Sequence, residues 1–166
     1  MANLLSTAPL AFNTIYNLIT AAANTQSPVV QVFHTAVFQN EPASYVLLEK
    51  IENHHFDWDS LGTFAFTEEY SIIGEATYYT GQSGAAATQD TITSAYALFQ
   101  SLVQSTMVQN RNPPISAALQ SAGVIHIIPG YARYTGEPGI AEGGAAMGFF
   151  GTVNWSYTIK ARVTVT

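Results

Sequence analysis

The sequence predicts one α+β domain with a mixed, largely antiparallel sheet of four or five strands and two helices on one face. Three observations support this prediction. The segment 153–165 alternates apolar and polar residues without error, as a strand with one buried face does. Segments 7–23 and 90–107 instead carry apolar residues at helical spacing. Strand patterns lie before and after the second helix, so the expected order is αβββαββ.

The first half of the chain divides into one helix and three strands. Pro9 near its start and the Ser27–Pro28 pair after its end delimit the first helix. β-Branched and aromatic residues predict a strand over 29–38, and the segment 45–51 is predicted to be its antiparallel return. Segment 64–79 is the candidate for a long central strand.

The second half begins with a glycine-containing loop, after which Asp90 is predicted to cap the second helix. A short helical turn is expected over 115–120, and a strand over 124–134 is interrupted at Pro129. Segment 135–151 contains six glycines and one proline. We expect it to be an irregular loop or contact arm within a single domain that spans residues 1–166.

Composition favours a folded protein with an unusual surface. Apolar residues make up 48% of the chain, which is ample for a core, whereas charged residues make up only 10%. Small polar residues or contacts with neighbouring subunits must therefore cover the surface. The N-terminus lacks a signal-peptide pattern and no apolar run is long enough to span a membrane, so we expect a soluble protein.

The net charge of −6 and the scattered basic residues exclude a basic stripe for binding nucleic acid. An acidic wall would instead repel DNA that passed beside it. The absence of cysteine excludes disulfides, thiolate catalysis and cysteine-ligated metal sites.

A metal site is the strongest catalytic hypothesis. In an extended chain, His55, Asp57 and Asp59 would point to one side, and their imidazole and carboxylate groups suit zinc, manganese or iron. Together with His54 they define an alternative interpretation, a small metal-dependent hydrolase. The segment 53–62 is polar and turn-like, however, with a short strand through Phe56 and Trp58 as an alternative, and solvated polar residues explain it more simply than a metal site does. We therefore expect no metal or other cofactor and no enzymatic activity.

Other catalytic patterns are weaker. The chain has no G-x-S-x-G motif, and His34 and His126 lie in strand patterns where histidine is usually structural. Glu68 and Glu69 would face opposite sides of a strand, so we interpret them as a solvated strand end. The glycines of 143–148 lack the Lys-Ser/Thr that follows in a phosphate-binding loop.

Large apolar residues among these glycines indicate an interface, because a monomer gains little by exposing them on flexible backbone. The polar face of the last strand adds two of the five basic residues in an acidic protein. The predicted interface residues are Tyr78, Tyr79, Met147, Phe149, Phe150, Lys160 and Arg162.

Two stretches carry a family resemblance. They are Glu68-Glu-Tyr-Ser-Ile-Ile-Gly-Glu-Ala-Thr-Tyr-Tyr-Thr-Gly, followed by the 90–107 helix, and Trp155-Ser-Tyr-Thr-Ile-Lys-Ala-Arg-Val near the end. With the order of elements, they resemble the tail terminator proteins of long, non-contractile-tailed bacteriophages (siphophages). The resemblance covers most of the chain in outline and these stretches in detail. Segments 54–62 and 135–151 are longer than the family pattern.

The resemblance implies a structural virion protein without an active site, located in the tail or neck and in the host cytoplasm during assembly. It implies a homohexameric ring that caps the tail tube and joins it to the head–tail connector or stopper protein. DNA would pass through the lumen without specific binding, and no membrane is involved. Alternatives are another neck or head–tail joining component, a tail tube subunit, or a carbohydrate-binding module that uses Trp58 and Trp155.

Overall fold

The computed structural model describes residues 6–34, 44–58, 65–82, 84–109, 117–140 and 146–164. It is an α+β structure with a mixed five-stranded sheet, which confirms the predicted class. The strands are β1 (Gln31–Phe33), β2 (Ser44–Trp58), β3 (Ala65–Thr80), β4 (Val124–Ile140) and β5 (Ala146–Thr164). The helices are α1 (Ala8–Ala23), α2 (Ala85–Leu98), α3 (Ser105–Gln109) and α4 (Ala117–Ser121).

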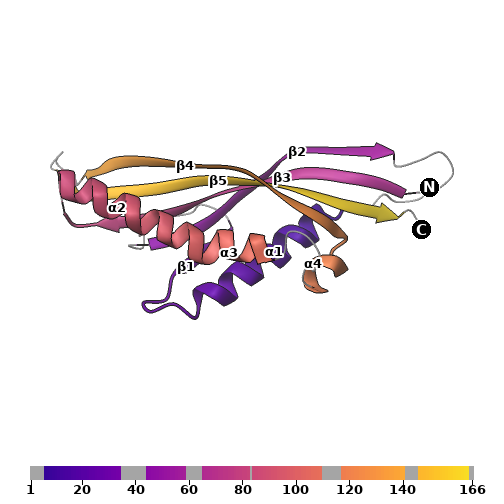
Figure 1. The fold of residues 1–166 in the computed structure, drawn as a ribbon, viewed down its shortest axis with the longest axis horizontal. Helices are drawn as coiled ribbons and strands as arrows, with labels where there is room; N and C mark the ends of the chain where they lie inside the picture. The colour runs from indigo at the N-terminus through magenta and orange to yellow at the C-terminus, as the bar shows by residue number, and fades with distance from the viewer. Residues whose placement is uncertain are drawn as a thin grey trace.

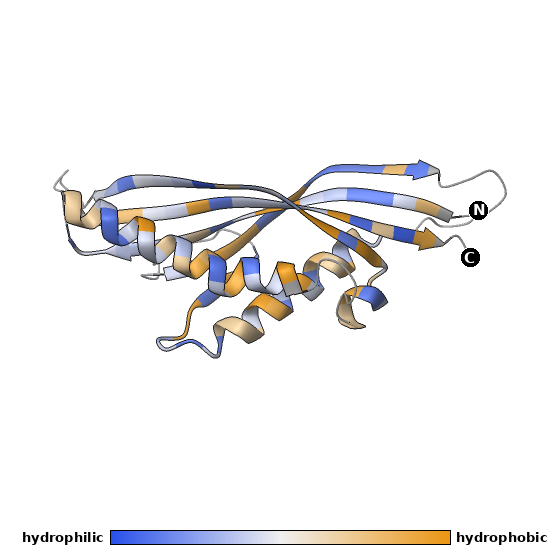
Figure 2. Ribbon diagram, in the orientation of Figure 1, coloured by the Kyte–Doolittle hydropathy of each residue, from blue (hydrophilic) through white to orange (hydrophobic). Residues whose placement is uncertain are grey.

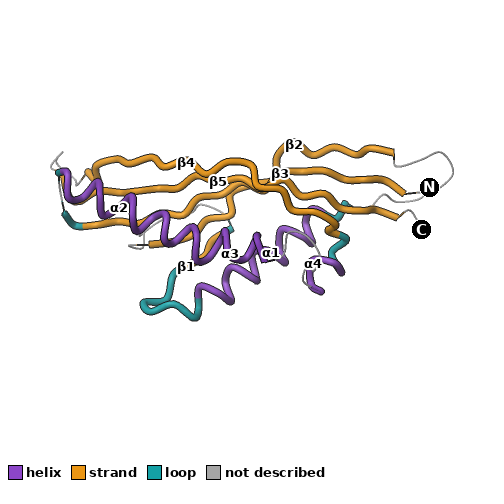
Figure 3. The backbone as a smooth tube through the Cα atoms, in the orientation of Figure 1, coloured by secondary structure: helices purple, strands orange, loops and turns teal. Residues whose placement is uncertain are grey.

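The sheet has the order β1-β2-β3-β5-β4, and the helices lie on one side of it (Figure 1). All neighbouring strands are antiparallel except β1 and β2, which are parallel. The predicted antiparallel return after the first strand is therefore wrong. Residues 34–43 separate the two strands, which is more than the two-residue turn of a tight antiparallel hairpin needs. The long strands extend beyond the helices at one end (Figure 3).

The core lies between the helices and the facing side of the sheet. The alternation of β5 is confirmed, because Trp155, Ile159 and their odd-numbered neighbours are buried. Helix α1 contributes Ala11, Ile15 and Ile19, each fully buried. Figure 2 shows hydrophobic residues on α1 and on the strand segments that cross it, whereas the outer part of β2 is largely hydrophilic. Helix burial therefore follows the sequence pattern closely.

Two segments expected to be mainly irregular are strands over their described residues. Residues 53–58 continue β2 as far as Trp58, which confirms the alternative of a strand through Phe56 and Trp58, and the sheet accommodates their polar side chains through a bulge between Glu52 and His55. Most of the expected loop 135–151 belongs to the β4–β5 hairpin, and only 141–145 lies outside the described residues.

The glycines of that hairpin allow close contacts within regular structure. A Cβ on Gly151 would collide with Thr91 of α2, so this glycine lets the helix approach the sheet. Gly148 has a φ of +80°, a conformation that favours glycine. The number of glycines in a segment does not by itself show whether they allow close packing within strands or form a loop.

The second helix begins earlier and ends later than expected. Gly84 precedes it with a φ of 77°, and Asp90 lies inside α2 rather than at its N-cap. After α2 the helix continues through a π-helical turn, Phe99–Gln104, into α3. The expected helical turn near 115–120 is α4, so the prediction of two helices was incomplete. Within the described ranges, no helix has both the length and the apolar character needed to cross a membrane.

Candidate functional site

A buried carboxylate joins the start of α1 to the sheet. Glu68 on β3 is 0% exposed. One oxygen, Oε1, accepts hydrogen bonds from Ser6 Oγ at 2.5 Å and from His54 Nε2 at 2.6 Å. The other, Oε2, accepts from the Thr7 amide at 2.7 Å and from its hydroxyl at 2.5 Å. The interpretation of Glu68 as solvated is wrong, because it shares the buried strand face with Phe66 and Tyr70.

The charge of Glu68 is stabilised where it lies. Burial raises the pKa of its carboxyl group, but the hydrogen bonds from Ser6, Thr7 and His54 outweigh burial and hold the pKa below its ordinary value. The carboxylate also lies at the N-terminus of α1, where the helix dipole favours negative charge. Burial likewise raises the pKa of Tyr70, which lies on the same buried face of β3. This cluster anchors the helix.

The same geometry does not match a hydrolytic triad. In a triad the histidine lies between the nucleophile and the acid, whereas here Ser6 and His54 both contact Oε1 of Glu68. The hydroxyl of Ser6 donates to a carboxylate instead of facing a base. The arrangement holds a segment in place and does not activate a nucleophile.

The sheet separates His54 from His55 and Asp57, two of the other proposed metal ligands. His54 faces the helix layer and binds Glu68, whereas His55 is paired with Glu69 and faces the opposite side. His55 Nε2 lies 3.6 Å from Asp57 Oδ2, and both side chains are at least half exposed. Asp59 lies outside the described residues. Among the residues that are described, no three potential ligands come together as a metal site would require.

The remaining histidines lie at the surface. His34 is exposed just after β1, and its ring contacts Tyr16 edge-on with centroids 5.0 Å apart. His126 is an exposed residue of β4 opposite Lys160. Neither position suggests a catalytic base.

The sheet side away from the helices is the second candidate site, and we refer to it as the open face. Its central rows carry hydroxyl pairs across β3 and β5, at 3.3 Å between Ser71 and Thr158 and 2.9 Å between Thr77 and Thr152. Farther along, Lys160 Nζ lies 2.8 Å from Glu69 Oε2. Charged side chains of the same strands share this face with the hydroxyl groups, among them Glu69, Glu75, Lys160 and Arg162.

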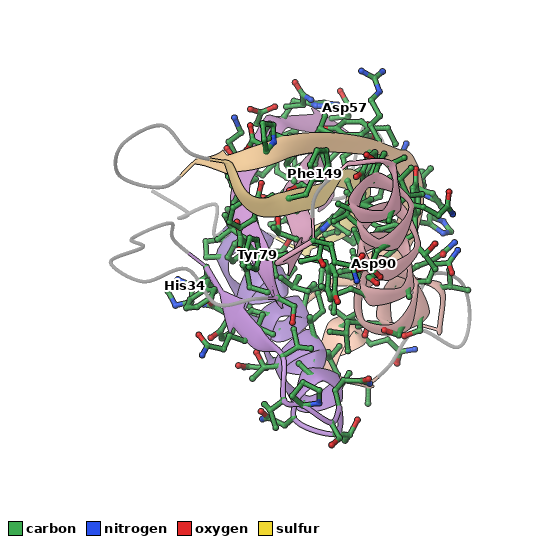
Figure 4. The ribbon with its side chains drawn as sticks, turned by 90° about the vertical axis from the view of Figure 1, so that its left-hand side faces the viewer. His34, Asp57, Tyr79, Asp90 and Phe149 are labelled. Carbon is green, nitrogen blue, oxygen red and sulfur yellow. The ribbon has the colours of Figure 1, made fainter. Side chains whose placement is uncertain are left out.

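The predicted interface residues fall into two groups at opposite ends of the sheet. At one end the rings of Tyr79 and Phe150 contact each other on the open face, with centroids 4.8 Å apart and their planes tilted by 43°. Tyr78 and Phe149 are on the helix side of the same strands, and Figure 4 shows Tyr79 and Phe149 from this end. The backbone of Met147 is in β5, but its side chain lies outside the described residues.

Lys160 and Arg162 occupy the other end of the open face. Lys160 forms the ion pair with Glu69, whereas Arg162 is exposed and opposite Thr67. The two basic residues therefore differ in their availability to a partner, which their common strand parity did not reveal.

A pocket of about 360 Å³ lies on the open face at the aromatic end. Its lining includes the carboxylates of Glu75 and Glu137 and the rings of Tyr45 and Phe150, and Tyr45 donates to Glu75 Oε1 at 3.1 Å. We refer to it as the acidic pocket. The sequence does not reveal this pocket, because separate strands supply these groups. The available signal was that Glu75 shares strand parity with Tyr79.

The outer strand β4 also exposes apolar side chains. Ile125, Ile128 and Tyr131 are 38%, 44% and 40% exposed, and Arg133 covers the Tyr131 ring at 5.2 Å. Irregular pairing on either side of Pro129 interrupts the ladder between β4 and β5. Bulges and proline discourage the addition of another strand to an edge, so contacts here would involve side chains.

Neither the protein-family models nor the curated proteins that were searched match this chain.

Proposed function

We propose that this chain is a structural subunit of a phage virion, a tail terminator that forms a ring at the end of the tail tube and joins it to the head connector. The observation that carries the proposal is the open face. Strands of up to 19 residues form a sheet that helices cover on one side only. An uncovered face of this length, lined by small hydroxyl groups and charged side chains, is suited to packing against another subunit.

The exposed apolar residues of β4 support the same proposal. Ile125, Ile128 and Tyr131 lie on an edge strand next to the open face. Large apolar groups gathered on one element are typical of protein–protein contacts. The low charge of the chain also agrees with a surface shared among neighbours in a closed ring.

The net charge of −6 bears on the lumen of such a ring. Repeated around a ring, acidic subunits would repel DNA and let it pass without binding. The protein would thus act in the virion tail or neck, after assembly in the host cytoplasm. Its partners would be further copies of itself, the tail tube protein and the connector or stopper protein.

The closest alternative is another neck component or a tail tube subunit. A one-sided sheet with a long hairpin would serve those roles too. The two long helical segments favour the terminator, in agreement with the order of elements in the family that the sequence resembles.

The test is the mass of the purified protein in solution, combined with negative-stain microscopy of the protein alone and with tail tubes. Rings at one tube end are the expected result. Long tubes formed by this protein alone would replace the proposal with a tube subunit. A monomer at all concentrations that never associates with tail components would refute an assembly function.

A further inference from the structure

We propose that Arg162 of one copy docks into the acidic pocket of a second copy and pairs there with Glu137 and Glu75. The inference rests on the proposed function, since it names a contact through which the subunits associate. It defines both halves of that contact, a basic side chain at one end of the open face and an acidic pocket at the other.

Comparison of the surroundings of each described basic side chain identifies Arg162 as the basic half of the contact. Lys50 lies 2.7 Å from Glu52, and Lys160 lies 2.8 Å from Glu69. Arg133 is placed over the Tyr131 ring. Among the described basic residues, Arg162 alone has neither an ion pair nor an aromatic contact, and its side chain is exposed. It is therefore available to a partner.

The acidic half fits a guanidinium group. The pocket presents two carboxylates, and its aromatic rings can stack on a planar cation. Glu137 is exposed and forms no ion pair within the described part of the chain. Glu75 is oriented by the Tyr45 hydroxyl. Arginine can pair with a carboxylate through two parallel hydrogen bonds, which a lysine cannot do.

The two halves cannot meet within one molecule. Arg162 lies twelve residues after Phe150 on β5, and Phe150 lines the pocket. At about 3.3 Å per strand residue, this separation is about 40 Å. Both halves belong to the open face, so a second copy can supply the complement. Repetition of the contact from end to end would generate a ring or a chain of subunits.

The experiment uses the full chain with two single variants, Arg162→Glu and Glu137→Arg, alone and as an equimolar mixture. In each variant alone, the contact would join two like charges. In the mixture, the glutamate introduced into one chain meets the arginine introduced into the other, and the remaining contact keeps its natural pair. Sedimentation velocity would measure assembly, because it resolves monomers and oligomers.

We expect each variant alone to associate at least about tenfold more weakly than the wild type, since closely paired interfacial charges are strongly coupled. The mixture should recover wild-type association. Added salt should weaken the wild type and the mixture alike. A double variant, Gln100→Glu with Gln120→Glu, adds the same charge as Arg162→Glu on exposed helical positions and should assemble normally. Unchanged thermal denaturation would show that the single variants are folded.

The outcomes separate the inference from the proposed function. If the wild type assembles and each single variant assembles equally well, the inference alone is overturned. The same holds if the single variants are impaired and mixing them does not restore association. A wild type that remains monomeric would overturn the proposed function as well. Rescue in the form of dimers would support the contact and exclude the ring.

Discussion

Replacing Glu68 with glutamine tests whether the buried carboxylate anchors α1 to the sheet. Four hydrogen bonds converge on this side chain, from Ser6, Thr7 and His54. Glutamine keeps its shape and can accept from the Thr7 amide. At the other position an amide nitrogen replaces a carboxylate oxygen, so Ser6 and His54 must change from donor to acceptor.

The expected loss follows from the strength of charged hydrogen bonds. Such bonds exceed neutral ones by roughly 1 kcal/mol each, so four contacts give an upper value of about 4 kcal/mol. Neutralising a buried charge recovers part of its desolvation cost. We therefore expect Glu68→Gln to lower the free energy of unfolding by about 2–4 kcal/mol, a large part of the stability of a typical domain.

Urea denaturation at several pH values would measure the effect. Because the folded protein holds the pKa of Glu68 below its ordinary value of 4.5, the stabilisation is fully present above that value. It is lost as the pH falls through the folded-state pKa, so the difference between wild type and variant should shrink in acid and stay constant near neutrality.

Glu69→Gln is the matched control for this experiment. Glu69 is the next residue on the same strand, but it faces the open side and pairs with Lys160 at a partly exposed position. Removing a surface ion pair usually costs no more than about 1 kcal/mol. If Glu68→Gln cost no more than Glu69→Gln at neutral pH, the anchoring role of Glu68 would be refuted.

Three further predictions concern packing and the open face. Gly151→Val should destabilise the protein by about 1–3 kcal/mol because its side chain would displace Thr91, whereas Gly81→Ala, with open space around it, should have little effect on the melting temperature. Trp155→Ala should cost about 3–5 kcal/mol in urea unfolding, because the ring is fully buried; a smaller loss would mean that the core collapses around the cavity. Lys160→Gln should change stability by less than about 1 kcal/mol and leave self-association intact, since Glu69 already engages this side chain; impaired association would assign Lys160 to the subunit contact.

Local sequence patterns predicted the helices and strands that bury one face against the core. The alternation in 153–165 and the helical stripes in 7–23 and 90–107 correspond to the buried faces of β5, α1 and the α2–α3 helix. Boundaries were less predictable. Neighbouring strands extended β2 and the β4–β5 hairpin into polar and glycine-rich sequence, where backbone pairing compensates for weak strand propensity.

The candidate sites could not be located without the register between strands, that is, without knowing which residues of neighbouring strands are paired. The burial of Glu68 was accessible from the sequence, since its parity matches that of Phe66 and Tyr70, but its partners Ser6 and His54 come from distant segments. The acidic pocket draws Glu75 and Glu137 from β3 and β4, which are not adjacent in the sheet. No spacing in the sequence places them together.

For Lys160 and Arg162, the sequence by itself determined the strand and its polar face. Period-two alternation is a property of neighbouring residues, so it is present in the sequence before folding. Only the tertiary structure decided that Glu69 engages Lys160, that Arg162 stays exposed, and that an acidic pocket lies at the far end of the same face. These facts depend on which strands pair and in what register, and long-range packing determines that pairing.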